Sequence, residues 1–273
     1  MLSERRFYMK NCLTIAGSDC SGGAGIQADL KAFSAMGTFG MSVVTSVVAE
    51  NTSRVISIQD IDNSIIADQL DAVFEDIEVH GVKVGMLSNA GIMKTVAEKL
   101  KEYKPCFAVI DPVMVATSGG VLLKSDSLDT LVNEIIPLSF VLTPNIPEAE
   151  ALAGMKISSV DDMKKAAVRI HGLGAKNVLV KGGHLTREAT DILYDGENFH
   201  SFSHERIDSK NTHGTGCTLS SAITARLALG DDIINAVHTA KIYLTEAISN
   251  SFSVGKGNGP VNHFYEYYNM KGF

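Results

Sequence analysis

Residues 12–37 read CLTIAGSDCSGGAGIQADLKAFSAMG and contain the parts of a strand–loop–helix unit. The first six residues, CLTIAG, have the composition of a β-strand that ends in glycine. From Ala24 onward, apolar side chains recur at spacings of three and four residues, which is the periodicity of a helix with one apolar face. These side chains are Ile26, Leu30, Phe33 and Met36. Gly37 follows them as a helix terminator, so the stretch predicts a strand joined through a glycine-rich loop to a helix.

Strand-like and helix-like segments keep alternating along the chain. Runs rich in β-branched residues occupy positions 41–51, 81–86, 106–113, 140–145 and 177–183. Amphipathic segments of helical periodicity occupy positions 63–76, 89–103, 127–137, 159–174 and 218–229. This alternation is typical of a parallel sheet with helices on both faces. We therefore predict a three-layer α/β/α fold in which 41–51 is a nearly continuous buried strand.

Residues 190–202, TDILYDGENFHSF, interrupt the alternation. Two strand-like runs flank Asp195-Gly196, a pair that favours a tight hairpin turn. We expect a late antiparallel hairpin at one edge of the mostly parallel sheet. No repeat, low-complexity tract or linker divides the chain, so we predict one domain over residues 12–273, preceded by a flexible leader at 1–11.

The bulk composition excludes several classes of protein. The chain has 273 residues, 45% of them apolar, and a formal net charge of −7. The negative charge argues against a nucleic-acid or anionic membrane partner, and no run of 18 apolar residues predicts a membrane span. Four cysteines lack any CxxC spacing and there is no signal-peptide pattern. We expect a cytoplasmic protein.

Polar residues and glycines gather where the predicted strands end. In an open parallel sheet the ligand binds beyond the carboxyl ends of the strands. The residues at these ends are therefore candidates for one site, and they are Gly17–Asp19, Glu50–Asn51, Met86, Asp111, Asn145 and Gly182–Gly183.

The loop GSDCSGGAGIQAD, residues 17–29, allows more than one interpretation. Its glycines let the backbone approach a ligand and lead into a helix N-terminus, which attracts anions. Gly23 and Gly25 form a variant of the dinucleotide fingerprint, and Glu50 follows the next strand where a ribose-binding acid would lie. A P-loop is excluded because no Lys-Ser or Lys-Thr closes the glycines. A dinucleotide oxidoreductase and a glycine-rich turn without a ligand both remain alternatives.

The segment KNTHGTGCTLSSAITARLAL, residues 210–229, places glycines at a second helix N-terminus. The free amides of Gly214, Thr215, Gly216 and Cys217, together with the helix dipole, would form an anion hole suited to a phosphoryl group. The dipole should lower the pKa of the Cys217 thiol, although a bound polyphosphate would oppose that shift. Redox and metal roles lack the required partner residues, whereas an inert buried cysteine remains an alternative. His213 is more typical of a structural hydrogen-bonding residue than of a base.

Oxygen ligands for a magnesium ion follow two strands of the predicted sheet. Asp111, Asn145 and Glu148 could together hold Mg²⁺ and, through it, nucleotide phosphates. Asn145 also fits a helix N-cap, and both roles are compatible. Asp111 could instead form a turn before Pro112, and Lys181 could reach a phosphate or stay solvated.

Five motifs in this order resemble the hydroxymethylpyrimidine/phosphomethylpyrimidine kinases of thiamin synthesis, in the ribokinase-like superfamily. They are LTIAGSDCSGGAGIQADLKAFSAMG, DPVMVATSGG, LTPNIPEAEAL, VLVKGGH and NTHGTGCTLSSAI. The resemblance implies a ribokinase-like fold, ATP and Mg²⁺ as cofactors, and phosphorylation of a hydroxymethyl group on a planar heterocycle. It also suggests a homodimer. Cys217 stands where most ribokinase relatives have the aspartate that deprotonates the acceptor hydroxyl.

The same resemblance implies roles for further residues. The substrate pocket would be lined by Gly17, Ala24, Glu50, Met86 and Val113. Asp111 and Glu148 would serve the metal ion, and the nucleotide would be bound by Asn145, Lys181, Thr212 and Lys241. The turn at Ala116–Gly120 corresponds to a lid segment whose glycines permit closure.

Two positions depart from the family pattern. Glu50 replaces a common glutamine, and a carboxylate accepts hydrogen bonds but donates none unless it is protonated. Cys20 replaces a common proline, and we have no functional account of it. A pyridoxal kinase is the alternative within the superfamily, although cysteine-type pyridoxal kinases often have a lid cysteine that VATSGG lacks. A nucleotide-binding regulator without turnover is the alternative from another class.

Overall fold

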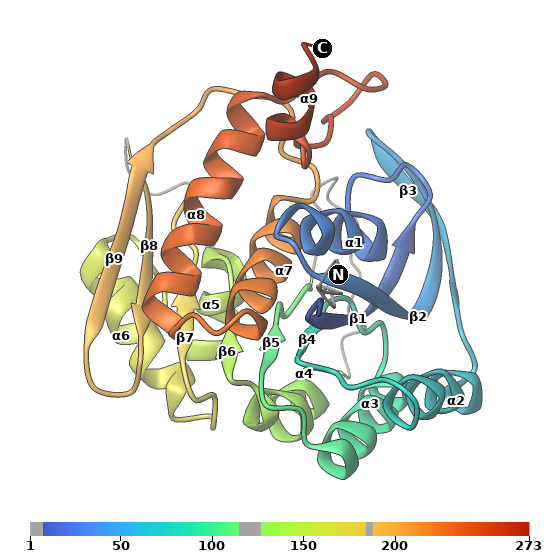
Figure 1. Cartoon of the computed structure of the whole chain (residues 1–273). Coiled ribbons are helices and arrows are strands. Elements are labelled where there is room, and N and C mark those ends of the chain that lie inside the picture. Colours follow the sequence, from blue (N-terminus) through green and yellow to red (C-terminus); the bar gives the residue numbers. More distant parts are fainter. Residues whose placement is uncertain (1–7, 115–126, 184–187, 273) are drawn as a thin grey trace, which may run out of the picture.

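The computed structural model describes residues 8–114, 127–183 and 188–272, and its centre is a nine-stranded sheet (Figure 1). The strand order is β3-β2-β1-β4-β5-β6-β7-β8-β9. Strands β2, β1, β4, β5, β6 and β7 run parallel, while β3, β8 and β9 are joined to the sheet by antiparallel pairing. The predicted mostly parallel α/β sheet with a late edge hairpin is confirmed. The strands are β1 (Asn11–Asp19), β2 (Phe39–Asn51), β3 (Arg54–Asp60), β4 (Gly81–Val84), β5 (Ala108–Ile110), β6 (Val141–Leu142), β7 (Val178–Val180), β8 (Glu188–Tyr194) and β9 (Phe199–Glu205).

Helices cover both faces of the sheet because successive strand residues point to opposite faces. In β5, Ile110 packs with the helices of one face, whereas Val109 packs with those of the other. The first face is covered by α2 (Asn63–Phe74), α3 (Ala90–Tyr103), α5 (Ile146–Ala153) and α6 (Val160–His171). The opposite face carries α1 (Gly25–Ala35), α7 (Thr215–Ala228) and α8 (Ile233–Ser249), seen in front of the strands in Figure 1. A short α9 (Tyr265–Lys271) follows.

Three segments differ from the sequence-based prediction. Strand β3, which pairs antiparallel with β2 at the sheet edge, was not predicted. Strand β2 was expected to be almost continuously buried, but its buried residues mostly alternate with half-buried ones, and Val47 is 49% exposed. The helix expected at 127–137 is divided into α4 (Leu128–Thr130), the π-helical turn η1 (Leu131–Ile135) and the 3₁₀ turn η2 (Ile136–Leu138). Pro137 at its end cannot donate a helical hydrogen bond.

The predicted hairpin turn and helix caps are present. Asp195 Oδ1 accepts from the amides of Glu197 and Asn198, and Gly196 has φ +98°. The Asn89 side chain caps α3 by accepting from Ile92 N. Strand β1 begins at Asn11, the last residue of the predicted leader, and residues 1–7 lie outside the described part of the chain.

The order of the strands fixes the position of the ligand site. The chain passes from β1 to β2 on one side of β1 and later returns to β4 on its other side. Crossovers that leave in opposite directions open a crevice at the carboxyl ends of these strands. The loop after β1, which contains Gly22, Gly23 and Gly25, lies at this point. Among the described residues, no helix combines the length and the apolar run that a membrane crossing requires.

Candidate active site

A cavity of about 950 Å³ lies along the carboxyl ends of the strands. All fifteen residues that were given a catalytic or binding role line it, including Cys217 from α7 and Glu50 from β2, whereas the strand-end candidates Asn51 and Gly182 do not. The structure therefore brings together residues that are up to 224 positions apart in the sequence, from Gly17 to Lys241. The full set is Gly17, Ala24, Glu50, Met86, Asp111, Val113, Asn145, Glu148, Lys181, Thr212, Gly214, Thr215, Gly216, Cys217 and Lys241.

The turn before α7 is packed tightly against the loop after β1. Gly214 is the N-cap of α7 and has φ +80°, a conformation that favours glycine. A Cβ atom at Gly214 would lie 1.8 Å from the carbonyl oxygen of Gly23. The two glycine-rich loops can therefore meet only because neither has a side chain at this contact. Residues 214–217, at the N-terminus of α7, therefore line the cavity, where a helix N-terminus favours an anion.

Two buried polar side chains of α7 bond to carbonyl groups of the same helix turn. Thr218 Oγ1 donates to the Gly214 carbonyl, and Ser220 Oγ donates to the Gly216 carbonyl. Helix α7 is thus buried nearly all round between the sheet and helices α1 and α8, rather than along the one face that its apolar residues predicted. Its N-terminus is consequently held rigidly at the cavity.

The Cys217 thiol lies where the N-termini of two helices meet. It is in the first turn of α7, and the amide of Gly25, the first residue of α1, acts to lower its pKa. Burial raises the pKa of this thiol to about 11, with Asp29 and Asp111 acting in the same direction and Lys83 opposing them. The expected lowering by the helix dipole is therefore wrong for the ligand-free protein, because desolvation is the larger effect.

Asp111 and Lys181 form an ion pair at the centre of the cavity. Lys181 Nζ lies 2.6 Å from Asp111 Oδ1, which also accepts a hydrogen bond from Thr143 Oγ1 at 3.1 Å. The other oxygen, Oδ2, would lie 3.1 Å from a Cβ atom at Gly216, so it faces the α7 turn. Lys181 is not solvated as one alternative proposed, because its ammonium pairs with this carboxylate.

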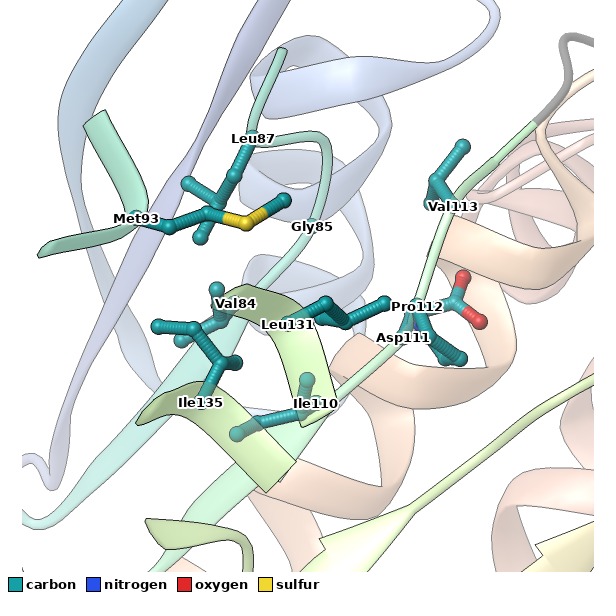
Figure 2. A pocket seen from close by; sticks show the side chains of 10 residues that line it. All are labelled: Val84, Gly85, Leu87, Met93, Ile110, Asp111, Pro112, Val113, Leu131 and Ile135. Carbon is teal, nitrogen blue, oxygen red and sulfur yellow. The ribbon is translucent and has the colours of Figure 1, made fainter. Parts of the chain in front are cut away.

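Apolar side chains from the neighbouring elements support the end of β5. A small hollow of about 10 Å³ lies there, lined by side chains such as Leu131 and Met93. Figure 2 shows these side chains on one side of the Asp111–Pro112 backbone, with the Asp111 carboxylate directed away from them. Asp111 as a residue is 3% exposed, so the direction of its carboxylate is fixed by packing on one side and by Lys181 on the other.

Glu148 and Asn145 cap helix α5 reciprocally. Asn145 Oδ1 accepts from the Glu148 amide at 3.0 Å, and Glu148 Oε2 accepts from the Asn145 amide at 2.9 Å. This confirms the N-cap interpretation of Asn145. Burial raises the pKa of Glu148 to about 7. The charge of Lys181 opposes this shift, whereas the charge of Asp111 adds to it.

Asp19, Glu50 and His213 form a cluster at the end of the cavity near β1 and β2. One ligand atom from each lies within 4.8 Å of the other two. Asp19 Oδ2 accepts from His213 Nε2 at 2.9 Å and from the amides of Gly23 and Ala24. Burial acts to raise the pKa of Asp19, but the bonds from His213 and the loop outweigh it and hold the pKa below its usual range. Asp19 thus organises the glycine loop rather than offering free ligand atoms.

The charges in this cluster set the protonation of Glu50. Burial lowers the pKa of His213, but the hydrogen bond to Asp19 outweighs this and raises it, which favours the imidazolium. Burial and the charge of Asp19 raise the pKa of Glu50 to about 7, partly offset by His213. Near neutral pH, Glu50 therefore exists in both forms, and its protonated form can donate a hydrogen bond into the cavity.

Two predicted nucleotide ligands, Lys241 and Thr212, line other parts of the cavity wall. Lys241 in α8 is 7% exposed, and its ammonium lies 2.5 Å from Asp191 Oδ2 in β8. Asp191 also accepts from the Gly182 amide through Oδ1. Thr212 lies in the turn before α7, where its carbonyl accepts from Thr215 N at 3.3 Å. The lid segment Ala116–Gly120 lies outside the described residues.

Two parts of the site were missed by sequence reasoning. Asp19 was noted only as part of the strand end, and its position within a glycine-rich loop was the signal that it caps that loop. Lys83 in β4 was not assigned at all, although a lysine within the strand GVKV needs a charged partner. That partner is Asp29, whose Oδ2 lies 2.9 Å from Lys83 Nζ.

Comparison with known proteins agrees with this geometry. Residues 19–262 match the family model of phosphomethylpyrimidine kinase. The chain is 47% identical to the hydroxymethylpyrimidine/phosphomethylpyrimidine kinase of Bacillus subtilis over 92% of its own length and 94% of the relative. It is 50% identical to a thiamine biosynthesis bifunctional protein of Geobacter sulfurreducens, covering 96% of this chain and 54% of that longer protein.

Solved structures give the same result. The crystal structure of a phosphomethylpyrimidine kinase from Clostridium difficile is 51% identical, with a TM-score of 0.79 over 88% of this chain and 99% of that one. An ADP complex of a Bacillus subtilis pyridoxal kinase is 41% identical, with a TM-score of 0.89 over 95% and 99% of the two chains. The fold is therefore the ribokinase-like fold shared by these vitamin kinases. From the matched residues 19–262, the chain belongs to the phosphomethylpyrimidine kinase family, whose members are phosphotransferases.

Proposed function

We propose that this kinase transfers the γ-phosphoryl group of ATP to the hydroxymethyl group of 4-amino-5-hydroxymethyl-2-methylpyrimidine, and then to its monophosphate, in thiamin biosynthesis. The observation that carries the proposal is the convergence of the α7 amides, Cys217 and the Asp111–Lys181 pair on one cavity. We further propose that residues 12–273 act as one kinase domain, as a homodimer in the cytoplasm.

The transfer requires one bond to form and one to break. The acceptor oxygen bonds to the γ-phosphorus while the bond from that phosphorus to the ADP oxygen breaks. The proton of the acceptor hydroxyl passes to the sulfur of Cys217, which is a thiolate before the step. The amides of Gly214, Thr215 and Gly216 would stabilise charge on the transferred group. Cys217 leaves the step as a thiol and later loses the proton to solvent.

The residues at the centre of the cavity fit a magnesium ion. Carboxylate oxygens are the ligands that Mg²⁺ prefers, together with water. Asp111 Oδ2 faces the α7 turn, so Asp111 would hold the ion, while Glu148, engaged in its helix cap, would act through a bound water. Such an ion neutralises phosphate charge. Lys181, adjacent to Asp111, would supply further positive charge to the same phosphate.

Different parts of the cavity fit the two substrates. Asn145, Thr212 and Lys241, which line it, would bind the nucleotide. The heterocycle would lie near the ends of β1 and β2, among apolar and polar groups that suit a planar ring. These groups are Gly17, Ala24, Glu50, Met86 and Val113.

The test of the proposed function is ADP release from Mg-ATP with three acceptors offered separately. We expect turnover with hydroxymethylpyrimidine and with its monophosphate, and weaker turnover with pyridoxal. Pyridoxal is the second candidate because a pyridoxal kinase is among the similar structures, with a TM-score of 0.89. Turnover with pyridoxal alone would replace the proposed substrate, and no turnover with any acceptor would leave a nucleotide-binding regulator.

Glu50 is predicted to make pyrimidine binding depend on pH. Its pKa is raised to about 7, so below pH 7 the carboxylic acid can donate to a ring nitrogen and accept from the 4-amino group. Above pH 7 the carboxylate only accepts. We therefore expect the KM for the pyrimidine to rise as the pH increases from 6 to about 8.5, by about tenfold, the value of one lost hydrogen bond.

Glu50→Gln is the matched variant, because an amide donates and accepts at every pH in this range. Its KM for the pyrimidine should not change between pH 6 and pH 8.5. Its KM for ATP should stay within about twofold of the original value, because a substitution away from a binding contact usually changes a free energy by less than about 0.5 kcal/mol. A variant whose KM for ATP changes more than that for the pyrimidine would place Glu50 outside the substrate pocket.

A further inference from the structure

A buried ion pair lies beneath the Cys217 thiol. Lys83 in β4 and Asp29 in α1 are both 0% exposed, and their charged atoms are 2.9 Å apart. Asp29 also accepts hydrogen bonds from Thr14 Oγ1 at 2.6 Å and Ser221 Oγ at 2.8 Å. A fully buried ion pair is weak as a source of stability, since desolvation offsets the attraction. Because the Lys83–Asp29 pair lies close to the Cys217 thiol, its charges can act on the protonation of that thiol.

The two helices that meet at the thiol also carry Asp29 and its hydrogen-bond donor Ser221. Residues four apart on a helix share a face. On α7, Cys217 is four residues before Ser221, and on α1, Gly25 is four residues before Asp29. Gly25 and Cys217, in the first turns of the two helices, line the same cavity, and Ser221 donates to Asp29 one turn deeper. The Lys83–Asp29 pair therefore lies one helical turn below the thiol along the α1–α7 contact.

The Lys83 ammonium has more N–H donors than its hydrogen bond to Asp29 requires. A lysine ammonium carries three N–H donors. Within the described residues its hydrogen bond goes to Asp29 Oδ2, and its charge acts on Cys217 as well as on Asp29 and Asp111. Burial lowers the pKa of Lys83, but these neighbouring negative charges outweigh it and raise the pKa, so the group stays charged.

We propose that Lys83, held in place by Asp29, is a positioning residue that stabilises the negative charge of the Cys217 thiolate before it accepts the substrate proton. The other charges that act on this thiol are Asp29 and Asp111, which oppose the thiolate, and Lys181, which favours it. Lys181 is paired with Asp111 at 2.6 Å and would be drawn to phosphate, whereas Lys83 is fully buried and is not among the residues that line the cavity. The inference rests on the proposed role of Cys217 as the base.

The test measures the rate at which iodoacetamide alkylates Cys217 at pH 8, by mass spectrometry of its peptide, in the protein without nucleotide. Asp29→Asn keeps the size and shape of the side chain but removes the negative charge that neutralises Lys83. We therefore expect alkylation to be at least about threefold faster, which is a small fraction of the energy of an interaction between two buried charges. Lys83→Met combined with Asp29→Asn removes both charges, and alkylation should be at least about threefold slower than in the unchanged protein.

Changes of the alkylation rate in opposite directions in the two variants distinguish an electrostatic role of Lys83 from a structural one. A loosened active site would expose the thiol and speed alkylation in both variants, so a shift in the same direction in both would overturn the proposal, as would two unchanged rates. The matched control is Lys99→Met combined with Asp71→Asn, another lysine–aspartate pair at 2.7 Å on the α2–α3 surface, which should leave the alkylation rate unchanged.

Turnover distinguishes this inference from the proposed function. The Lys83→Met/Asp29→Asn protein should have a lower kcat with its KM for ATP unchanged, because the nucleotide site is intact. Slower alkylation with an unchanged kcat would support the coupling of Lys83 to Cys217 and would count against Cys217 as the base.

Discussion

Cys217→Ala is expected to lower kcat by about 10²-fold or more while ATP binding is retained, since a positioned base contributes about 10²–10⁴-fold. The alanine leaves the amides of Gly214, Thr215 and Gly216 in place, because they are fixed by packing against the loop after β1. The residual rate then reports what phosphate stabilisation and positioning achieve without a base. Steady-state ADP release gives kcat, and nucleotide binding is measured by isothermal titration calorimetry.

Two further variants make this result specific to the site. Cys106→Ala removes an exposed thiol far from the cavity lining and should leave kcat unchanged. Cys217→Asp supplies the carboxylate that the resemblance to ribokinase relatives implies at this place, and it should recover part of the activity lost in Cys217→Ala. A near-normal kcat in Cys217→Ala would remove the thiol from the reaction.

The protonation of Cys217 shows where sequence reasoning ended. The glycines before residue 217 and the apolar residues after it were sufficient to place the thiol at a helix N-terminus, and the structure confirms that position. The direction of its pKa shift was wrong because burial by α1 and the charges of Asp29 and Asp111 raise it. These groups come from distant parts of the chain, so their effect depends on tertiary packing.

The parallel centre of the sheet was easier to predict than its edge strand β3. Strand–helix alternation identifies a parallel sheet because each crossover helix must cover a face. Strand β3 was missed because its residues are mostly exposed and it pairs only with β2 at the edge. Helix α8 was also not assigned, although it supplies Lys241 to the cavity. The predicted cavity lining nevertheless assembled, because strand ends in a parallel sheet share one rim.

Gly214→Ala should be the most damaging single change at the α7 turn. The φ of +80° alone costs a non-glycine residue about 1–2 kcal/mol. The added Cβ would also lie 1.8 Å from the Gly23 carbonyl oxygen, so one of the two loops must move. We expect the free energy of unfolding to fall by about 4 kcal/mol or more, the size typical of forced backbone rearrangement. Chemical denaturation measures this loss.

A glycine elsewhere separates the two causes. Gly154, the C-cap of α5, has φ +61° and no atom within 4 Å of an added Cβ, so Gly154→Ala should cost only the conformational share of about 1–2 kcal/mol. The excess in Gly214→Ala then measures the overlap with Gly23. Displaced amides should also reduce kcat of the folded fraction by about 10²-fold or more, the cost of losing one anion-hole donor. Equal losses of stability in the two variants, with kcat intact in Gly214→Ala, would show that the contact between the two glycine loops does not hold the phosphate site.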